Sequence, residues 1–238
     1  MRKPIESVAI ITGAVGNLGQ ATARSFQAAG YRTVLVDRSP ERLREVFAAL
    51  VDDPGHLLAG GIDLANASSV ENLASNVIER FGRIDALVNT VGGWRGGQPV
   101  HESNDADWEF LLNINLRTTL HCCRAVIPQM LRQGRGKIVN VASRDALNGS
   151  AGYAAYSVSK SAVVRLTEAL ADELKEADIN VNCILPGTID TPQNRAALPD
   201  ADFAKWVEPA ALAEAILFLA SDAARAIHGA AVPVYGKG

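Results

Sequence analysis

Residues 12–20 read TGAVGNLGQ, and this glycine-rich stretch decides how the chain is expected to fold. The apolar run SVAIITG (7–13) leads into it, and a segment of helical periodicity (17–29) follows. A strand that passes through such a turn into a helix presents backbone N–H groups and the positive end of the helix to an anion. Many glycine turns are only tight turns, so the meaning of this one depends on the rest of the chain.

Short apolar runs alternate with longer helical segments along the whole chain. Several runs are almost continuous in Val, Ile and Leu, which is typical of parallel strands buried on both faces. The expected strands are 7–13, 33–37, 56–64, 85–91, 136–143, 179–185 and 230–235. The expected helices are 17–29, 40–50, 68–81, 104–133, 153–176 and 209–221. The pattern predicts an α/β, doubly wound Rossmann fold: a seven-stranded parallel sheet with helices on both faces, in a single domain over 1–238.

Residues that favour helix ends support these boundaries. Ser39 followed by Pro40 is typical of a capped helix start with proline at the first helical position. Ser68 and Glu71 have the S-x-x-E spacing of a capping box. Gly30 and Gly82 follow helices where a left-handed residue often ends the helix.

Composition excludes several classes of protein. The chain has 238 residues, 48% hydrophobic and 21% charged, which is ordinary for a soluble domain. Its net charge of −3 argues against a nucleic-acid or anionic-membrane partner, since both need a cationic surface. The apolar run Val8–Ile11 is too short for a signal peptide or a membrane span, so a cytoplasmic location is expected.

Cysteines and histidines show no metal-binding spacing, and no metal site is expected. The three cysteines lack a CxxC pattern and favour buried, reduced thiols: Cys122, Cys123 and Cys183. The four histidines show neither HxxxH nor HExxH: His56, His101, His121 and His228.

An acidic residue at the end of the second expected strand indicates what kind of ligand the glycine turn binds. Asp37 lies 24 residues after Gly13, where a carboxylate can accept hydrogen bonds from an adenosine ribose and repel a 2′-phosphate. The turn, helix and acid together predict dinucleotide binding, with NAD favoured over NADP. Arg38 follows directly; it could stack on adenine, meet a phosphate in another loop geometry, or be a solvated charge.

Further motifs follow the turn in a fixed order. They are Asp63-Leu64, Asn89 in LVNTVG, Asn115 in INLRT, Ser143 at the end of VNVAS, Tyr156 and Lys160 as Y-x-x-x-K, and Pro186-Gly187 in PGTIDT. Over essentially its whole length the chain resembles the short-chain dehydrogenase/reductase family. The family turn T-G-x-x-x-G-x-G matches residues 12–19, but Asn17 replaces its middle glycine, and Thr90 and Val91 depart from the family's L-V-N-N-A-G.

The resemblance implies a nicotinamide cofactor over the turn. The residues expected to bind it are Gly13, Gly16, Asn17, Leu18, Gly19, Asp37, Arg38, Asp63, Leu64, Asn89, Tyr156, Lys160, Pro186, Gly187, Ile189 and Thr191. Thr191 could instead cap a helix before Pro192. Because asparagine tolerates positive φ, Asn17 is expected to take a left-handed or otherwise glycine-like conformation, unless Gly16 carries the strain.

The catalytic residues are expected to be Asn115, Ser143, Tyr156 and Lys160. Tyr156 and Lys160 are four residues apart, so they share one helix face, where an ammonium would lower the pKa of the phenol. Tyr156 can then exchange a proton with a carbonyl or alcohol oxygen, and the Ser143 hydroxyl can stabilise charge on that oxygen. In the family, Asn115 supports a water linked to the lysine. Tyr153 is interpreted as a wall of the cleft.

The substrate site is expected to include Trp94, Ser143, Tyr153 and Tyr156 under a lid at about 188–208. The segments GGWRGG (92–97) and 190–206 resemble quinonoid dihydropteridine reductase, which would put Trp94 beside a planar substrate. That branch lacks the serine, however, so Ser143 favours interconversion of a carbonyl and a secondary alcohol. The alternatives are the pteridine activity and a catalytically silent NAD(H) sensor.

Assembly is inferred from the resemblance alone. Family members associate through the long helices, here about 104–133 and 153–176, which implies a homo-oligomer, either a dimer or a tetramer. A small-molecule substrate is the other expected partner.

Overall fold

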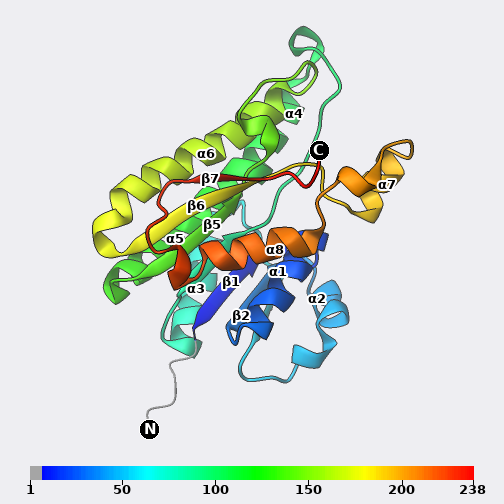
Figure 1. Ribbon diagram of the computed structural model, residues 1–238. Helices are drawn as coiled ribbons and strands as arrows, with labels where there is room; N and C mark the ends of the chain where they lie inside the picture. Colours follow the sequence, from blue (N-terminus) through cyan, green and yellow to red (C-terminus); the bar gives the residue numbers. More distant parts are fainter. Residues whose placement is uncertain (1–6) are drawn as a thin grey trace.

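The computed structural model describes residues 7–238. Residues 1–6, which belong to the predicted domain 1–238 and to the N-terminal segment expected to lack a signal peptide, lie outside the described residues. The chain forms one parallel sheet in the order β3-β2-β1-β4-β5-β6-β7 (Figure 1), so the predicted seven-stranded doubly wound fold is confirmed. The strands are β1 Val8–Thr12, β2 Arg32–Asp37, β3 Leu57–Gly60, β4 Ala86–Asn89, β5 Gly136–Val141, β6 Ile179–Pro186 and β7 Ala231–Val234.

Helices cover both faces of the sheet. One layer holds α1, α2 and α8, and the other holds α3, α5 and α6 (Figure 1). The helices are α1 Asn17–Ala28, α2 Pro40–Val46, α3 Ala67–Phe81, α4 Asp105–Leu111, α5 Thr118–Gln133, α6 Ala154–Leu174, α7 Pro192–Ala197 and α8 Pro209–Leu219. Over residues 7–238, no helix is both long and apolar enough to cross a membrane.

Alternate side chains of the strands pack into two separate hydrophobic cores, one on each face of the sheet. Val8 and Ile10 of β1 pack with α3, α5 and α6, whereas Ala9 and Ile11 pack with α1, α2 and α8. Successive side chains of a strand point to opposite faces, so a strand between two helical layers must be apolar at every position. This explains the continuous apolar runs of the sequence.

Two positions of the glycine-rich turn, Gly13 and Gly19, favour a residue without a side chain. Gly13 has a φ of 61°, in the left-handed region that favours glycine. A Cβ atom on Gly19 would lie 2.1 Å from the Gly13 carbonyl oxygen, so α1 can pack this closely only on a glycine.

The expected conformation of Asn17 is wrong. Among residues 7–238 the one non-glycine residue with positive φ is Asp178, and Asn17 is the first residue of α1. Gly16 is extended, with φ −72° and ψ 161°, and carries no unusual strain either. The middle position of the turn therefore needs no glycine here.

The expected helix over 104–133 is divided into three pieces. Between α4 and α5, residues Leu112–Arg117 form a π-helical turn. Asn115 lies inside it and hydrogen-bonds Gly93 and Ser159, two residues from distant segments. A widened turn is common where a side chain must be re-aimed for such contacts.

Most of the helix ends predicted from capping residues are found in the structure. Ser39 accepts a hydrogen bond from the Arg42 N–H with Pro40 at the helix start, and Gly82 ends α3 with a φ of 74°. The capping box at Ser68 is wrong: α3 begins at Ala67, and the Asn66 side chain accepts from the Ser69 N–H at 3.2 Å.

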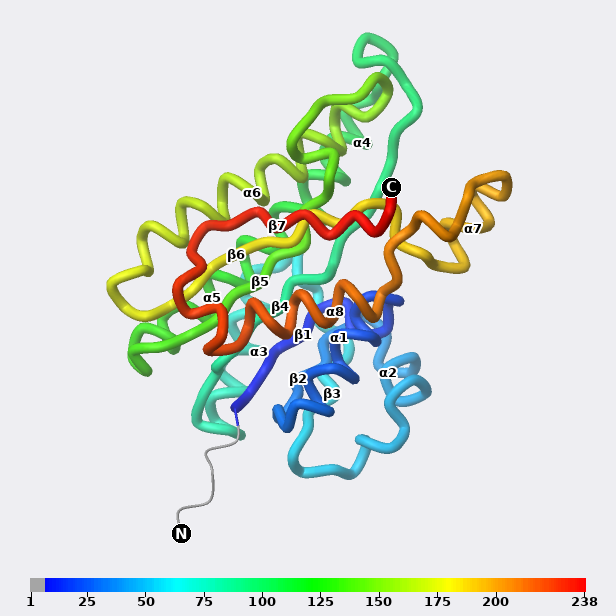
Figure 2. Tube along the Cα trace, viewed as in Figure 1, coloured from blue at the N-terminus to red at the C-terminus, as the bar shows by residue number. Residues whose placement is uncertain are grey.

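The segment expected as a lid leaves the body of the molecule after β6. Figure 2 shows α7 standing away from the sheet between β6 and α8. Its base is fixed because Ile189 and Val207 form an isolated parallel bridge and the Asp190 N–H donates to the Val207 carbonyl. The lid therefore has a fixed base and a projecting tip.

Gly19→Ala should lower the free energy of unfolding by about 1–3 kcal/mol, although alanine favours a helix, because the new methyl group meets backbone that cannot move aside. Urea denaturation measures the effect. Gly149→Ala is the control, since a Cβ there meets nothing within 4 Å. Equal stability of the two variants would contradict the close approach of α1 to the turn.

Candidate active site

A cleft of about 620 Å³ lies at the carboxyl ends of the strands, beside the glycine turn. Seven of the residues expected to bind a dinucleotide line it: Gly13, Gly16, Asn17, Asp37, Arg38, Asp63 and Leu64. In an open parallel sheet this edge, where the strand order reverses between β1 and β4, is where ligands bind.

The turn can hold a phosphate group. A Cβ on Gly13 would lie 3.0 Å from the Val91 side chain and 3.2 Å from the Thr90 hydroxyl, so only a bare backbone fits here. Gly16 caps α1 without a side chain to accept the first N–H groups of the helix. Those donors and the helix dipole remain for an anion in the cleft.

Asp37 faces the turn from the end of β2. Its carboxylate accepts hydrogen bonds from the Val15 N–H at 3.4 Å and the Ser39 N–H at 3.2 Å, which fix its position at the rim of the cleft. Arg38 and Arg42 also line the cleft on this side. The ribose end of a bound dinucleotide would therefore meet both a carboxylate and guanidinium groups.

Other residues expected to bind the cofactor hold the structure instead of lining this cleft. Leu18 and Gly19 are buried in α1, and the Asn89 amide donates to Asn140 at 2.9 Å beneath the cleft. Pro186 ends β6. The Gly187 N–H donates to Val234, Ile189 bridges to Val207, and Thr191 caps α7 by accepting from the Asn194 N–H at 3.1 Å. Thr191 therefore caps a helix, as its alternative interpretation predicts, and its contact with the cofactor stays a prediction.

Ser143, Tyr156 and Lys160 come together from two elements. Ser143 follows the end of β5, and the other two lie near the start of α6. The Ser143 hydroxyl lies near enough to the Tyr156 phenol to lower the pKa of Tyr156. The spacing in the sequence thus places a hydroxyl, a phenol and an ammonium at one site.

Lys160 is buried behind this pair, with only 4% of its surface exposed. Its Nζ atom donates to the Val141 carbonyl oxygen at 3.0 Å. Burial lowers the pKa of Lys160 to about 8, because the charged form loses its hydration. A Cβ on Gly92 would lie 3.1 Å from this Nζ, and Gly92 also lines the dinucleotide cleft, so the lysine adjoins that cleft.

The expected lowering of the Tyr156 pKa is not found. Burial raises the pKa of Tyr156 above its ordinary value, the Ser143 hydroxyl lowers it, and the charge of Asp145 raises it further. The loss of hydration of a phenolate outweighs the lowering by the Ser143 hydroxyl. Tyr156 is therefore protonated at neutral pH in this structure.

Asn115 is hydrogen-bonded to two segments of the site, the loop after β4 and α6. Its side chain accepts from the Gly93 N–H at 2.9 Å and donates to the Gly93 carbonyl at 3.0 Å and to the Ser159 hydroxyl at 2.9 Å. A Cβ on Gly92 would lie 3.0 Å from the Asn115 amide oxygen. Asn115 thereby ties the loop after β4 to the helix that carries Tyr156.

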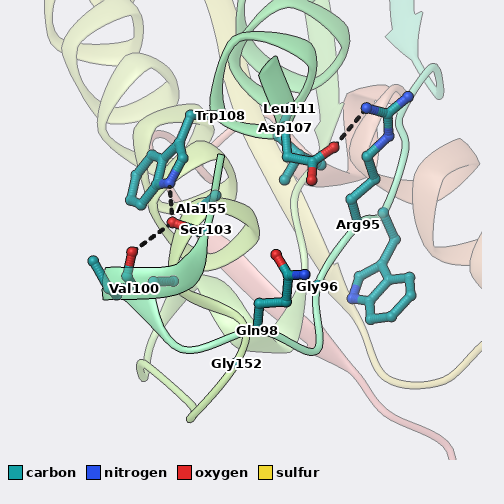
Figure 3. A pocket seen from close by; sticks show the side chains of 12 residues that line it. Arg95, Gly96, Gln98, Val100, Ser103, Asp107, Trp108, Leu111, Gly152 and Ala155 are labelled. Atoms are coloured by element: carbon teal, nitrogen blue, oxygen red, sulfur yellow. Dashed lines mark hydrogen bonds and ion pairs between the residues drawn. The ribbon is translucent and has the colours of Figure 1, made fainter. Parts of the chain in front are cut away.

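Trp94 and Tyr153 pack together at the start of α6, with ring centroids 5.6 Å apart. Trp94 is 54% exposed, so one side of its ring remains available. It also lines a smaller hollow of about 340 Å³ next to the start of α6. In Figure 3, Trp108 and Arg95 lie on opposite sides of this hollow, with Gln98 between them and Arg95 bonded to Asp107 at 2.6 Å.

One contact of the cleft could not be found from the sequence. The Asn17 amide donates to the Gln193 side chain at 2.9 Å, although the two residues are 176 positions apart. Both line the dinucleotide cleft, Asn17 from the turn and Gln193 from α7. The residue that replaces the expected glycine thus connects the phosphate turn to the lid.

No group of three or more His, Cys, Asp or Glu side chains in residues 7–238 is placed to hold a metal ion. Cys122, Cys123 and Cys183 are buried and free, as their spacing predicts. Burial raises the pKa of Cys123 to about 12 and that of Cys183 to about 11, so these thiols are inert at neutral pH.

Comparison with known proteins agrees with this geometry. The family model described as short chain dehydrogenase matches residues 7–202. A (2S)-[(R)-hydroxy(phenyl)methyl]succinyl-CoA dehydrogenase subunit, BbsD, of Thauera aromatica is 38% identical and covers 96% of this chain and 95% of its own length. A D-threitol dehydrogenase of Mycolicibacterium smegmatis is 36% identical and covers 96% of this chain and 91% of its own length.

Solved structures share the fold closely. An NAD⁺-bound xylitol dehydrogenase superposes with a TM-score of 0.88 at 28% identity and covers 98% of this chain and 100% of its own. ElxO with NADP bound has a TM-score of 0.88 at 23% identity and covers 97% of this chain and 98% of its own, which shows the fold alone. The chain belongs to the short-chain dehydrogenase/reductase family. It is an oxidoreductase that acts on CH–OH or C=O groups with a nicotinamide cofactor.

Asn17→Gly and Gln193→Ala should each weaken NADH binding by roughly two- to tenfold, the value of one exposed hydrogen bond. The double variant should lose no more than either single one, because both remove the same contact. Fluorescence titration with NADH measures the dissociation constants. Gln98→Ala, outside this cleft, is the control; additive losses would contradict a shared bond between turn and lid.

Proposed function

We propose that this chain transfers hydride between NAD(H) and a carbonyl or secondary alcohol carbon by a Ser-Tyr-Lys mechanism. The observation that carries the proposal is that Ser143, after the end of β5, acts on the phenol of Tyr156 near the start of α6, with Lys160 buried one helical turn further on at the edge of the dinucleotide cleft. A hydroxyl and a phenol side by side can both bond one reacting oxygen. Lys160 adjoins the dinucleotide cleft through Gly92, which supports a reaction between cofactor and substrate.

Some residues of the chain would bind the cofactor, and others would transfer the proton. The glycine turn and the start of α1 would hold the pyrophosphate, and Asp37 the adenosine ribose. When bound, the nicotinamide gives or takes the hydride. In reduction, Tyr156 gives its proton to the carbonyl oxygen while Ser143 bonds the same oxygen. The Lys160 ammonium stabilises the phenolate that remains.

The position of Asp37 supports NAD over NADP. The Asp37 carboxylate is held at the rim by the Val15 and Ser39 N–H groups, so it cannot turn away from a 2′-phosphate. A second anion there would be repelled by the carboxylate. Arg38 and Arg42 line the same rim and would partly offset that repulsion. The preference for NAD is therefore expected to be moderate in size.

Tyr156→Phe should reduce turnover by a factor on the order of 100 or more, because the phenylalanine cannot give or take a proton. Tyr153→Phe should keep most of the turnover, since its ring can still pack on Trp94. Initial rates of NADH oxidation with a ketone measure both. If Tyr153→Phe proved inactive and Tyr156→Phe active, the assignment of the acid would be reversed.

Asp37→Ser should raise the affinity for NADPH relative to NADH by about tenfold or more, because the fixed negative charge at the ribose end is lost. The ratio of the two dissociation constants, from fluorescence titration, measures the effect. Asp53→Ser, an exposed change far from the cleft, is the control. An unchanged ratio in Asp37→Ser would contradict its role in cofactor selection.

A panel of substrates separates the proposal from its alternatives. Acetophenone, cyclohexanone, diacetyl and a quinonoid dihydropterin can each be tested with NADH. Reduction of ketones supports the proposal, whereas reduction of the pterin alone would favour the pteridine activity. Tight NADH binding without turnover of any of them would favour an NAD(H) sensor.

A further inference from the structure

The hollow of about 340 Å³ beside the start of α6 has walls rich in apolar and aromatic groups. Trp94 lines it from the loop after β4, and Trp108 and the buried Leu111 line it from α4. Around it, Trp94 and Val100 leave 54% and 61% of their surfaces exposed. Exposed apolar groups gathered round a concavity are typical of a site for a small ligand.

The two ionised side chains that line the hollow neutralise each other. Arg95 and Asp107 are bonded at 2.6 Å (Figure 3), and the Arg95 guanidinium also stacks over the Phe110 ring at 3.7 Å. The Trp108 N–H donates to the Ser103 hydroxyl at 3.0 Å, so the rest of this indole presents only carbon to its surroundings. A neutral, planar group therefore suits the hollow better than an ion does, because indole rings stack on flat aromatic surfaces.

The hollow begins within one helical turn of Tyr156. Ala154 and Ala155 line it and directly precede Tyr156 in α6. Trp94 also packs on Tyr153, the residue before this helix, with ring centroids 5.6 Å apart. Because consecutive Cα atoms are about 3.8 Å apart, the backbone that carries the phenol also borders the hollow.

Two segments of the chain line both the hollow and the dinucleotide cleft. In the loop after β4, Gly92 lines the cleft and Trp94 lines the hollow. In α4, Phe110 lines the cleft and the next residue, Leu111, lines the hollow. A substrate held beside the cofactor therefore has the hollow next to it.

We propose that this hollow is the subsite for an aromatic ring of the substrate, so that the enzyme selects ketones and secondary alcohols with an aryl substituent. The inference rests on the proposed hydride transfer and names the substrate class for it. In the reduction the carbonyl carbon gains hydride from NADH, its oxygen gains the Tyr156 proton, and solvent returns a proton to the phenolate. The aromatic ring of the substrate stays unchanged in the hollow, against Trp94 and Trp108.

Matched ketones with a flat or a saturated ring test the subsite. The pairs are acetophenone with cyclohexyl methyl ketone, and benzylacetone with its cyclohexyl analogue, so that the ring stands at two distances from the carbonyl. For at least one pair, the ratio of kcat/KM for the aryl ketone to that for its saturated partner should fall about three- to tenfold in Trp94→Leu and in Trp108→Leu. Leucine stays apolar but cannot stack, and comparison with wild type cancels the intrinsic reactivity of each ketone.

Phe218→Leu is the matched control, because it removes an exposed aromatic ring from α8, the helix that packs on α1. It should leave both ratios unchanged. Unchanged ratios for both pairs in Trp94→Leu and Trp108→Leu would overturn the inference. An equal loss of activity toward flat and saturated ketones, together with a smaller mass in size-exclusion chromatography, would also overturn it, because the hollow would then be an interface between copies of this chain.

Binding gives a second readout that does not need turnover. The chain has three tryptophans, so Trp206→Phe keeps only the two indoles of the hollow. With NAD⁺ bound, para-nitroacetophenone should quench their fluorescence with saturation, and adding Trp108→Leu should raise the midpoint about three- to tenfold. Saturable quenching without reduction of any ketone would refute the proposed hydride transfer but not the aryl site. Turnover with non-saturating quenching and unchanged ratios would refute the aryl site alone.

Discussion

The close approach of α1 to the end of β1 is the constraint on which the rest of the site depends. Gly19 lets the helix lie against the Gly13 carbonyl, where a Cβ would be 2.1 Å from that oxygen. The helix start is thereby aimed at the cleft, and the Val15 N–H reaches Asp37 at the end of the next strand. Both the anion-binding end and the ribose end of the cleft follow from this single contact. The glycines of the turn therefore allow α1 to pack closely as well as leaving room for an anion.

Burial shifts the pKa values of Tyr156 and Lys160. Lys160 is almost wholly enclosed, and its pKa falls to about 8, while the pKa of the neighbouring phenol rises. Both shifts disfavour the charged form, because neither ion can be hydrated in the protein. In this state the site holds a protonated tyrosine next to Ser143, which suits donation of a proton. A bound cofactor and substrate would change the hydration on which these shifts depend.

The fold and the candidate catalytic residues could be predicted because both produce local patterns in the sequence. Continuous apolar runs give the buried parallel strands, and Ser143, Tyr156 and Lys160 carry their spacing in the sequence. The conformation of Asn17 could not be predicted, because the sequence shows that a glycine is missing but not that its position is an ordinary helix start. Ser68 and Asn66 are both good capping residues, so local preference did not separate them.

Long-range contacts account for the other differences. The π-helical turn around Asn115 depends on partners 22 and 44 residues away, Gly93 and Ser159. The bond from Asn17 to Gln193 spans 176 residues. The raised pKa of Tyr156 depends on burial and on Asp145, and the spacing to Lys160 reveals neither. Such features exist only once the tertiary structure is formed.

Transfer of hydrogen from the cofactor to carbon tests the central claim most directly. The protein would be incubated with NADH that carries deuterium at both positions of carbon four of the nicotinamide, together with the ketone that it reduces fastest. The alcohol would then be examined by mass spectrometry. We expect one deuterium on the carbinol carbon of the alcohol formed by the wild type, and almost no alcohol from Tyr156→Phe. An alcohol without deuterium, or NADH oxidation without any alcohol, would contradict hydride transfer from the nicotinamide to the carbonyl carbon.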